Sequence, residues 1–167
     1  MSNENFNAAG HLQTMRIIVL ALVMGLATFT GIAVFIGQSQ EPTGAFVLTL
    51  VAPIFFLVTV GFSFMMPILM EKQFLQASMK SGKGHLSAQE LAMLFQSRLV
   101  VSAALVEGPG FLGCIAYIVE HRPLVLVIPA LAISLLLLKI PSADQLGAFI
   151  ENKQRDFEDL RSRGTYV

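Results

Sequence analysis

The sequence predicts an all-α integral membrane protein with four transmembrane helices, and three observations lead to that prediction. The chain of 167 residues is 54% apolar and only 13% charged, whereas soluble domains carry about 25% charged residues. Four apolar runs are long enough to cross all or most of a hydrocarbon layer about 30 Å thick, because a helix rises about 1.5 Å per residue. Polar, turn-rich segments separate these runs, as expected for the connections between membrane spans.

The runs and their flanks divide the chain into three predicted domains. Residues 1–14 form a polar N-terminal tail, residues 15–140 a transmembrane domain and residues 141–167 an amphipathic cytoplasmic tail. The expected spans are residues 15–37, 45–70, 97–119 and 124–140. The N-terminal tail holds no Lys or Arg, and the first run is longer than the apolar core of a secretory signal. We therefore interpret the first span as an uncleaved anchor.

The first two spans are joined by the loop GQSQEPTG, whose composition is typical of a turn. The second span is longer than a membrane crossing requires and holds Pro53 and Pro67. We expect it to tilt or to extend beyond the hydrocarbon, with bends near its ends. After the segment SGKG, Ser87 and Glu90 form the pattern of a capping box, in which the two residues satisfy each other's free backbone amides. A helix is predicted to begin here and to continue unbroken into the third span.

A tight turn that ends in Pro123 leads into the short fourth span. This turn carries Glu120 and Arg122, which we interpret as boundary charges that anchor a helix end. Beyond the fourth span, Ser142 and Gln145 form a second capping-box pattern. The tail then repeats apolar residues at helical spacing among charged ones: Leu146, Phe149, Ile150, Phe157 and Leu160. This pattern predicts an interfacial helix whose apolar stripe contacts the membrane surface.

The Lys and Arg residues fall almost entirely on one side of the predicted spans. Ten of the 11 lie in flanks on that side: Arg16, Lys72, Lys80, Lys83, Arg98, Lys139, Lys153, Arg155, Arg161 and Arg163. Arg122 alone lies on the opposite side. Because cytoplasmic flanks carry an excess of Lys and Arg, we expect both termini and the central loop to be cytoplasmic, in a bacterial inner membrane.

Glu107 is the leading candidate for a functional residue, because it lies about half way along the third apolar run. Insertion scales put an ionised carboxylate at the centre of a membrane helix at about 2.5–3.5 kcal/mol, so such a group is usually neutral, paired or exposed to a wet cavity. By helical spacing, Ala103, Gly110 and Cys114 share its side of the helix. We therefore expect the carboxyl group to face a packed helix rather than lipid.

A shift of the chain by 83 residues indicates an internal repeat. The shift places ALVMG (residues 21–25) on ALVEG (residues 104–108). In the partner helices, the sequence that ends in Pro53 lies against the one that ends in Pro129, and Pro67 lies against Pro141 if two residues are dropped. We infer a duplicated hairpin, with Met24 at the position of Glu107. Small residues at four-residue spacing along the equivalent helices predict close helix packing. These helix-packing candidates are Ala21, Gly25, Ala27, Gly31, Ala104, Gly108, Gly110 and Cys114.

The segment ALVEGPGFLGCIAY resembles small uncharacterised bacterial four-span membrane proteins that bear an AL-x-EG block, then an aromatic residue and an IAY-like ending. This resemblance implies a fold but no activity. A duplicated hairpin with a carboxylate in one copy also resembles, more distantly, the c subunit of vacuolar-type rotary ATPases. In that family the carboxylate lies on the second helix of its hairpin, whereas Glu107 lies on the first.

Two classes of function are open for Glu107. The carboxyl group either binds or relays a proton or cation in a membrane subunit, or stays neutral and hydrogen-bonds across a helix interface. In the second case the protein is a structural or assembly component of a membrane complex. We favour this reading, because a single carboxylate does not define an ion pathway. The candidate hydroxyl partners are Thr28, Thr30, Thr59, Ser63, Ser102 and Ser134.

Other classes of function find little support in the sequence. No catalytic cluster, phosphate loop or metal-binding motif is present, so we expect no enzyme activity, no metal and no cofactor. The single cysteine, Cys114, excludes CxxC chemistry and an intrachain disulfide. The formal net charge is zero, which gives no reason to expect a nucleic-acid partner. The expected partners are the lipid bilayer and either a second copy of the chain or other membrane subunits.

Overall fold

The computed structural model describes residues 8–38, 41, 46–82 and 85–162, and the regular structure in these residues is all helical. The helices, in chain order, are α1 (Ala8–Gly37), α2 (Val47–Lys80), α3 (Ala88–Glu120), the 3-10 helix η1 (Pro123–Leu126), α4 (Val127–Leu138) and α5 (Ala143–Ser162). The predicted all-α class is therefore confirmed for the described part of the chain.

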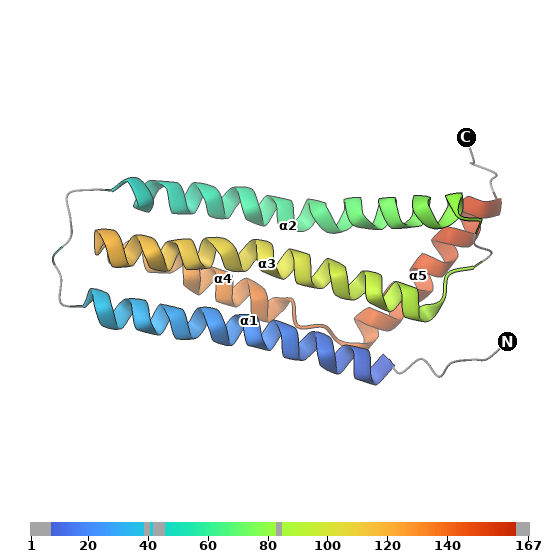
Figure 1. Ribbon diagram of the computed structural model, residues 1–167, viewed down its shortest axis with the longest axis horizontal. Coiled ribbons are helices and arrows are strands. Elements are labelled where there is room, and N and C mark those ends of the chain that lie inside the picture. Colours follow the sequence, from blue (N-terminus) through green and yellow to red (C-terminus); the bar gives the residue numbers. More distant parts are fainter. Residues whose placement is uncertain (1–7, 39–40, 42–45, 83–84, 163–167) are drawn as a thin grey trace.

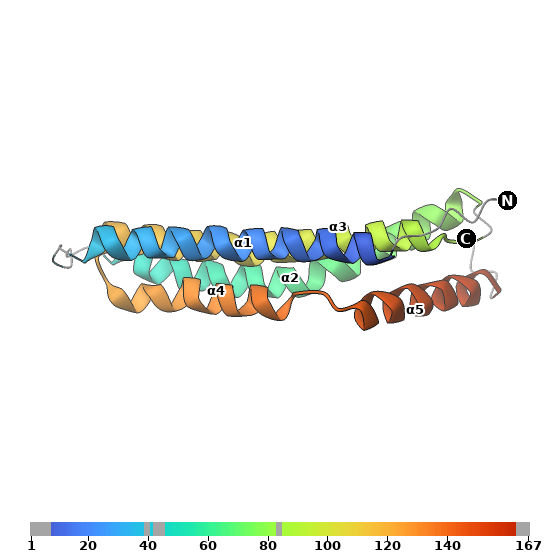
Figure 2. The ribbon, with the colours of Figure 1, turned by 90° about the horizontal axis from the view of Figure 1, so that it is seen from below.

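α3 is the central helix of the bundle. In Figure 1 it runs between α1 and α2, with α4 behind, and α5 crosses the end of the bundle at which α3 begins. Figure 2 shows α1 and α3 along one side of the bundle and α4 along the other. Thirteen of the 33 residues of α3 are buried, against seven of the 34 in α2. The difference arises because α3 packs on α1, α2 and α4, whereas α2 packs mainly on α3.

Three helices, α1, α2 and α3, are each long and apolar enough to cross a membrane. A fourth candidate crossing begins with η1 and α4 (Pro123–Leu138), which meet α5 at an angle of 68°. At about 2.0 Å per 3-10 residue and 1.5 Å per α-helical residue, η1 and α4 together rise about 26 Å. This fourth segment is shorter than predicted, since its helix ends at Leu138 rather than at residue 140.

The other helices extend beyond the spans predicted for them. α1 begins at Ala8 rather than at residue 15, α2 continues to Lys80 rather than residue 70, and α3 begins at Ala88 rather than residue 97. Pro53, Pro67 and Pro109 all lie inside continuous helices. The extensions of α2 and α3 form a protein surface beyond the most apolar part of the bundle.

Both capping boxes predicted from the sequence are present. Ser87 Oγ accepts a hydrogen bond from the Glu90 amide at 3.2 Å, and Glu90 Oε2 accepts one from the Ser87 amide at 3.1 Å. Ser142 and Gln145 form the same reciprocal pair, with both bonds at 3.2 Å. α3 then continues from its cap without a break to Glu120, as predicted.

α5 packs on the bundle through the apolar stripe that the sequence assigned to the membrane surface. Leu146 and Phe157 are each only 2% exposed, and they pack against side chains of α1, α2 and α3. The Phe149 ring lies 5.2 Å from the Phe95 ring of α3, centroid to centroid. The expectation of a lipid-facing stripe is therefore corrected, because the extensions of α2 and α3 supply a protein surface that covers it.

Candidate functional site

Glu107 lies in the seam between α1 and α3. Gly25 of α1 faces it, because a Cβ atom built on Gly25 would lie 3.9 Å from Glu107 Oε1. The Glu107 side chain is half-buried. Along α3, about 20 Å of helix separate it from Glu120 and about 14 Å from Arg98. The carboxyl group therefore lies deep within the apolar part of the bundle, beside a packed helix on one side only.

Small residues on α1 and α3, near the level of Glu107 along the helices, are exposed, and we call them together the small-residue face. It consists of Ala21, Gly25 and Thr28 on α1 and Ala104 and Gly108 on α3, all of them exposed. In each set the helical spacing places the residues on one side of the helix. A Cβ atom on Gly108 would meet nothing within 4 Å. In Figure 1, α1 and α3 lie side by side, with α4 behind them. The face is open because all five of its residues are exposed.

Glu107 makes no hydrogen bond or ion pair with any described residue. Four of the six hydroxyls expected as partners donate instead to carbonyl groups of their own helices, at 2.8–3.1 Å: Thr30, Thr59, Ser102 and Ser134. Among the described residues, the hydroxyls of Thr28 and Ser63 have no hydrogen-bond partner. The described part of the chain therefore leaves this carboxyl group without a donor.

The eight predicted helix-packing residues divide into two groups. Gly110 and Cys114 are buried, and a Cβ atom on Gly110 would lie 2.7 Å from Leu26 Cδ2 of α1. Cys114 Sγ lies 3.3 Å from Thr30 Oγ1. The other six are exposed: Ala21, Gly25, Ala27, Gly31, Ala104 and Gly108. Within one copy of the chain, close packing of α3 therefore depends on Gly110 and Cys114 rather than on the whole predicted set.

A second carboxylate on α3 is fully partnered, and the sequence alone did not reveal its role. Glu120 is 1% exposed and accepts hydrogen bonds from the amides of Leu48 at 2.7 Å and Thr49 at 2.8 Å, and from the Thr49 hydroxyl at 2.5 Å. Phe46, the N-cap residue of α2, offers no side-chain cap. Glu120 therefore satisfies two of the free amides of α2, and its charge matches the positive end of that helix.

From the sequence we expected Glu120 to anchor a helix end at the membrane boundary. Instead it is buried and caps the start of α2. The one signal in the sequence is the absence of a capping side chain at Phe46, where α2 starts. Nothing local identifies a carboxylate 72 residues away from Leu48 as the replacement. Next to it, His121 adopts a left-handed conformation with φ of 53°, which ends α3 and turns the chain toward α4.

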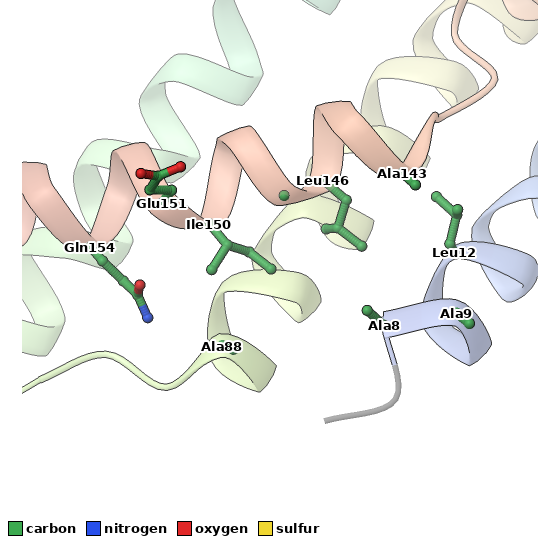
Figure 3. A pocket seen from close by; sticks show the side chains of 10 residues that line it. Ala8, Ala9, Leu12, Ala88, Ala143, Leu146, Ile150, Glu151 and Gln154 are labelled. Atoms are coloured by element: carbon green, nitrogen blue, oxygen red, sulfur yellow. The ribbon is translucent and has the colours of Figure 1, made fainter. Parts of the chain in front are cut away.

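Four cavities formed by described residues lie away from Glu107. An apolar cavity of about 530 Å³ opens where α5 meets the starts of α1 and α3, and Figure 3 shows Leu12, Leu146 and Ile150 around it. Glu107 does not line this cavity or any of the other three. Within the same part of the chain, no group of three or more His, Cys, Asp or Glu side chains could hold a metal ion.

Comparisons of the chain with protein-family models, with curated proteins and with solved structures find no match.

Proposed function

We propose that this protein is a structural component of a membrane complex, in which two copies of the chain pack through their small-residue faces and cover Glu107. One observation carries the proposal. Glu107 lies deep in the apolar part of α3, beside an open face, with no partner among the described residues.

A carboxyl group in this position requires a donor from outside its own chain. Exposure of an ionised carboxylate at the middle of a membrane helix costs about 2.5–3.5 kcal/mol. A hydrogen bond across a helix interface contributes about 1–2 kcal/mol and also removes the group from lipid. Ala104 and Gly108 leave room for the backbone of another helix to approach, as small residues do at membrane helix interfaces.

The chain itself carries a suitable donor. Thr28 is exposed on the same side of α1 as Gly25, and its hydroxyl donates to no described acceptor. Thr30, by contrast, donates to the Leu26 carbonyl at 2.8 Å. In a two-fold symmetric pair each copy presents the same face. Thr28 of one copy then approaches Glu107 of the other, and the two contacts are equivalent.

The proposal includes four spans, with both termini on the cytoplasmic side of a bacterial inner membrane. Cations of α1, α3 and α5 gather at one end of the bundle. There Arg16 donates to the segment between α4 and α5 at 3.0 Å, and Arg98 and Lys153 both pair with Glu71. Arg122 follows the opposite end of α3. Two further cations assigned to the cytoplasmic side lie outside the described residues: Lys83 and Arg163.

Cysteine labelling tests this orientation. In a Cys114→Ser background, single cysteines replace Ser39, Ser81 or Ser162 in whole cells. A membrane-impermeant thiol reagent should label the Ser39→Cys variant alone, because residue 39 lies in the loop with the fewest cations around it. Labelling of the Ser81→Cys or Ser162→Cys variant from outside would overturn the orientation.

We also propose that the two halves of the transmembrane domain are copies of one hairpin. α1 and α3 run side by side in the same direction (Figure 1), and they end at Gly37 and Glu120, which are 83 residues apart. That separation equals the shift that aligns the two sequences. The second helices differ, since α2 has 34 residues and α4 has 12. The copies would therefore have kept their first helices and diverged in their second.

Cross-linking in bilayers tests the assembly. In the Cys114→Ser background, Ala104→Cys places a thiol on the small-residue face. The matched control, Leu57→Cys, places one on α2, where Leu57 is 71% exposed. We expect a disulfide between copies for Ala104→Cys and none for Leu57→Cys under the same oxidation. A monomeric mass at every protein-to-lipid ratio, or equal cross-linking at both positions, would contradict the proposal.

Substitutions at the two proposed partners test its chemistry. Thr28→Val removes the donor and Glu107→Met removes the acceptor, so each should weaken self-association by about 1–2 kcal/mol. The double variant should lose little more than either single one, because both remove the same hydrogen bond. Glu107→Gln retains hydrogen-bonding capacity and should still assemble. Additive losses in the double variant would show that Thr28 and Glu107 do not contact each other.

A proton- or cation-handling subunit is the second candidate function. The observation in its favour is again the carboxyl group of Glu107, which no described residue holds in place and which is therefore free to exchange an ion. Liposomes with a pH or sodium gradient separate the two functions. Flux that depends on wild-type protein and is abolished by Glu107→Gln would favour transport. No flux, together with normal assembly of Glu107→Gln, would favour the structural role.

A further inference from the structure

A cavity of about 260 Å³ lies between α2, α3 and the end of α4. We call it the Lys139 cavity. Its polar lining consists of Ser63 on α2, Arg98 and Ser102 on α3, and Lys139 just after α4. A water molecule takes up about 30 Å³ in the liquid, so the cavity has room for more than one bridging water.

Ser63 is a buried polar group without a partner in this cavity. It is 2% exposed, and its hydroxyl makes no hydrogen bond to a described residue. Thr59, one turn earlier on the same face of α2, donates to the Phe55 carbonyl at 2.8 Å. Because a buried hydroxyl without a partner destabilises a fold, Ser63 is expected to bond a group that enters the cavity.

Lys139 brings a positive charge to the same cavity. Its ammonium group donates to Ser102 Oγ at 3.2 Å and lies 5.4 Å from the centroid of the Phe64 ring. It pairs with no carboxylate among the described residues. An ammonium group has three N–H donors, so its contact with Ser102 leaves donors for a ligand.

The neighbouring charges do not neutralise the cavity. Glu71 pairs with Arg98 at 3.1 Å and with Lys153, and Lys153 also pairs with Asp156 at 2.6 Å. Glu71 and Asp156 are thus paired with Arg98 and Lys153, and the positive charge of Lys139, which lines the cavity, is not neutralised by them. Arg98 lines the cavity, and its hydrogen bond to Glu71 uses one of its five N–H donors.

We propose that the Lys139 cavity binds a phosphate group. The hydroxyl of Ser63 and the ammonium of Lys139 donate to phosphate oxygens, and the guanidinium of Arg98 adds a second positive charge. The phosphate belongs either to the headgroup of an anionic lipid or to free phosphate. This site lies apart from Glu107 and does not depend on the proposed assembly.

Ligand binding to the purified protein in neutral detergent tests the site. Three ligands distinguish a lipid headgroup from free phosphate as the source of the bound phosphate. The ligands are phosphatidylglycerol, phosphatidylcholine as the lipid control, and inorganic phosphate. Preference for phosphatidylglycerol without binding of inorganic phosphate assigns the site to a lipid headgroup. Saturable binding of inorganic phosphate assigns it to free phosphate. Equal binding of the two lipids, without binding of inorganic phosphate, would overturn the proposal.

Three variants locate the binding within the protein. Lys139→Gln should weaken binding of the preferred ligand about fivefold, because one nearby cation contributes about 1 kcal/mol. Ser63→Ala should weaken binding of the same ligand about tenfold, as expected for loss of a hydrogen bond to a charged group. The control is Lys72→Gln, an exposed cation of α2 outside the lining of the cavity, which should leave binding unchanged.

A thermal unfolding measurement separates a binding role of Ser63 from a structural one. Without ligand, Ser63→Ala should unfold at the same temperature as wild type or higher, because it removes a buried hydroxyl that has no partner. With ligand, its stabilisation should be smaller than that of wild type. The proposal is overturned if Ser63→Ala binds as well as wild type, or if Lys72→Gln weakens binding as much as Lys139→Gln.

Discussion

Gly113 lies at a close approach of α3 to α4, and Gly113→Ala should force these helices apart. A Cβ atom on Gly113 would lie 2.9 Å from Pro129 Cδ and 3.1 Å from Ile128 Cβ. Neither atom moves away by a change of rotamer, since one belongs to a proline ring and the other is bonded directly to the backbone. The clash is therefore relieved only by a shift of the α4 backbone.

The size of the effect follows from this contact. Insertion of a methyl group into a tightly packed interface typically costs about 1–3 kcal/mol. Alanine also forms helix better than glycine by about 1 kcal/mol. The control must therefore be another glycine-to-alanine change in a helix, which includes the same gain in helix propensity. Gly61→Ala on α2 provides it, because a Cβ atom there would meet nothing within 4 Å. The free energy of unfolding of Gly113→Ala should therefore fall below that of Gly61→Ala by about 1–3 kcal/mol.

The buried thiol next to Gly113 supplies the assay. Cys114 is fully buried, so its rate of alkylation in mixed micelles reports opening of the bundle as denaturing detergent increases. Titrations of both variants then yield the two free energies of unfolding. Equal values for Gly113→Ala and Gly61→Ala would refute a rigid contact between α3 and α4.

Two further predictions concern the ends of the bundle. Phe157→Ala should destabilise the docking of α5 by about 3–5 kcal/mol, as for loss of a buried aromatic ring, while Leu160→Ala, at a position 37% exposed, should have a small effect. Limited proteolysis of α5 measures this, and equal protection of both variants would contradict the docking. Glu120→Ala should speed hydrogen exchange at the amides of Leu48 and Thr49, since it removes their acceptor. Unchanged exchange rates would mean that another group caps α2.

The features predicted correctly from the sequence are those that depend on neighbouring residues. Ser87 with Glu90, and Ser142 with Gln145, satisfy backbone amides within one helical turn, so the pattern alone determines the contact. The all-α class follows in the same way from composition and from the length of the apolar runs. Helix boundaries were less accurate, because α2 and α3 continue past their apolar runs as far as Lys80 and back to Ala88.

The features that the sequence did not reveal depend on residues far apart in the chain. An amphipathic stripe has the same pattern whether lipid or protein covers it, so the pattern around Phe157 did not identify the ends of α2 and α3 as its partner. Glu120 caps a helix that begins more than 70 residues earlier, and such a contact follows only from the way the helices are arranged. Sequence spacing likewise did not distinguish the exposed Gly108 from the buried Gly110.

The two carboxyl groups of α3 differ because of where free hydrogen-bond donors occur along a helix. At the start of α2 the first amides have no partner within the helix, and Glu120 accepts from two of them. In the middle of a span every amide already donates to a carbonyl one turn back, so Glu107 must rely on a side chain. Hydroxyls in the bundle mostly donate to their own helices, as Thr30 does, and Ser63 faces another cavity. Thr28 is the remaining hydroxyl among the candidates, and it is exposed on the outside of its own bundle. In the assembly that we propose, its acceptor is the Glu107 of a second copy.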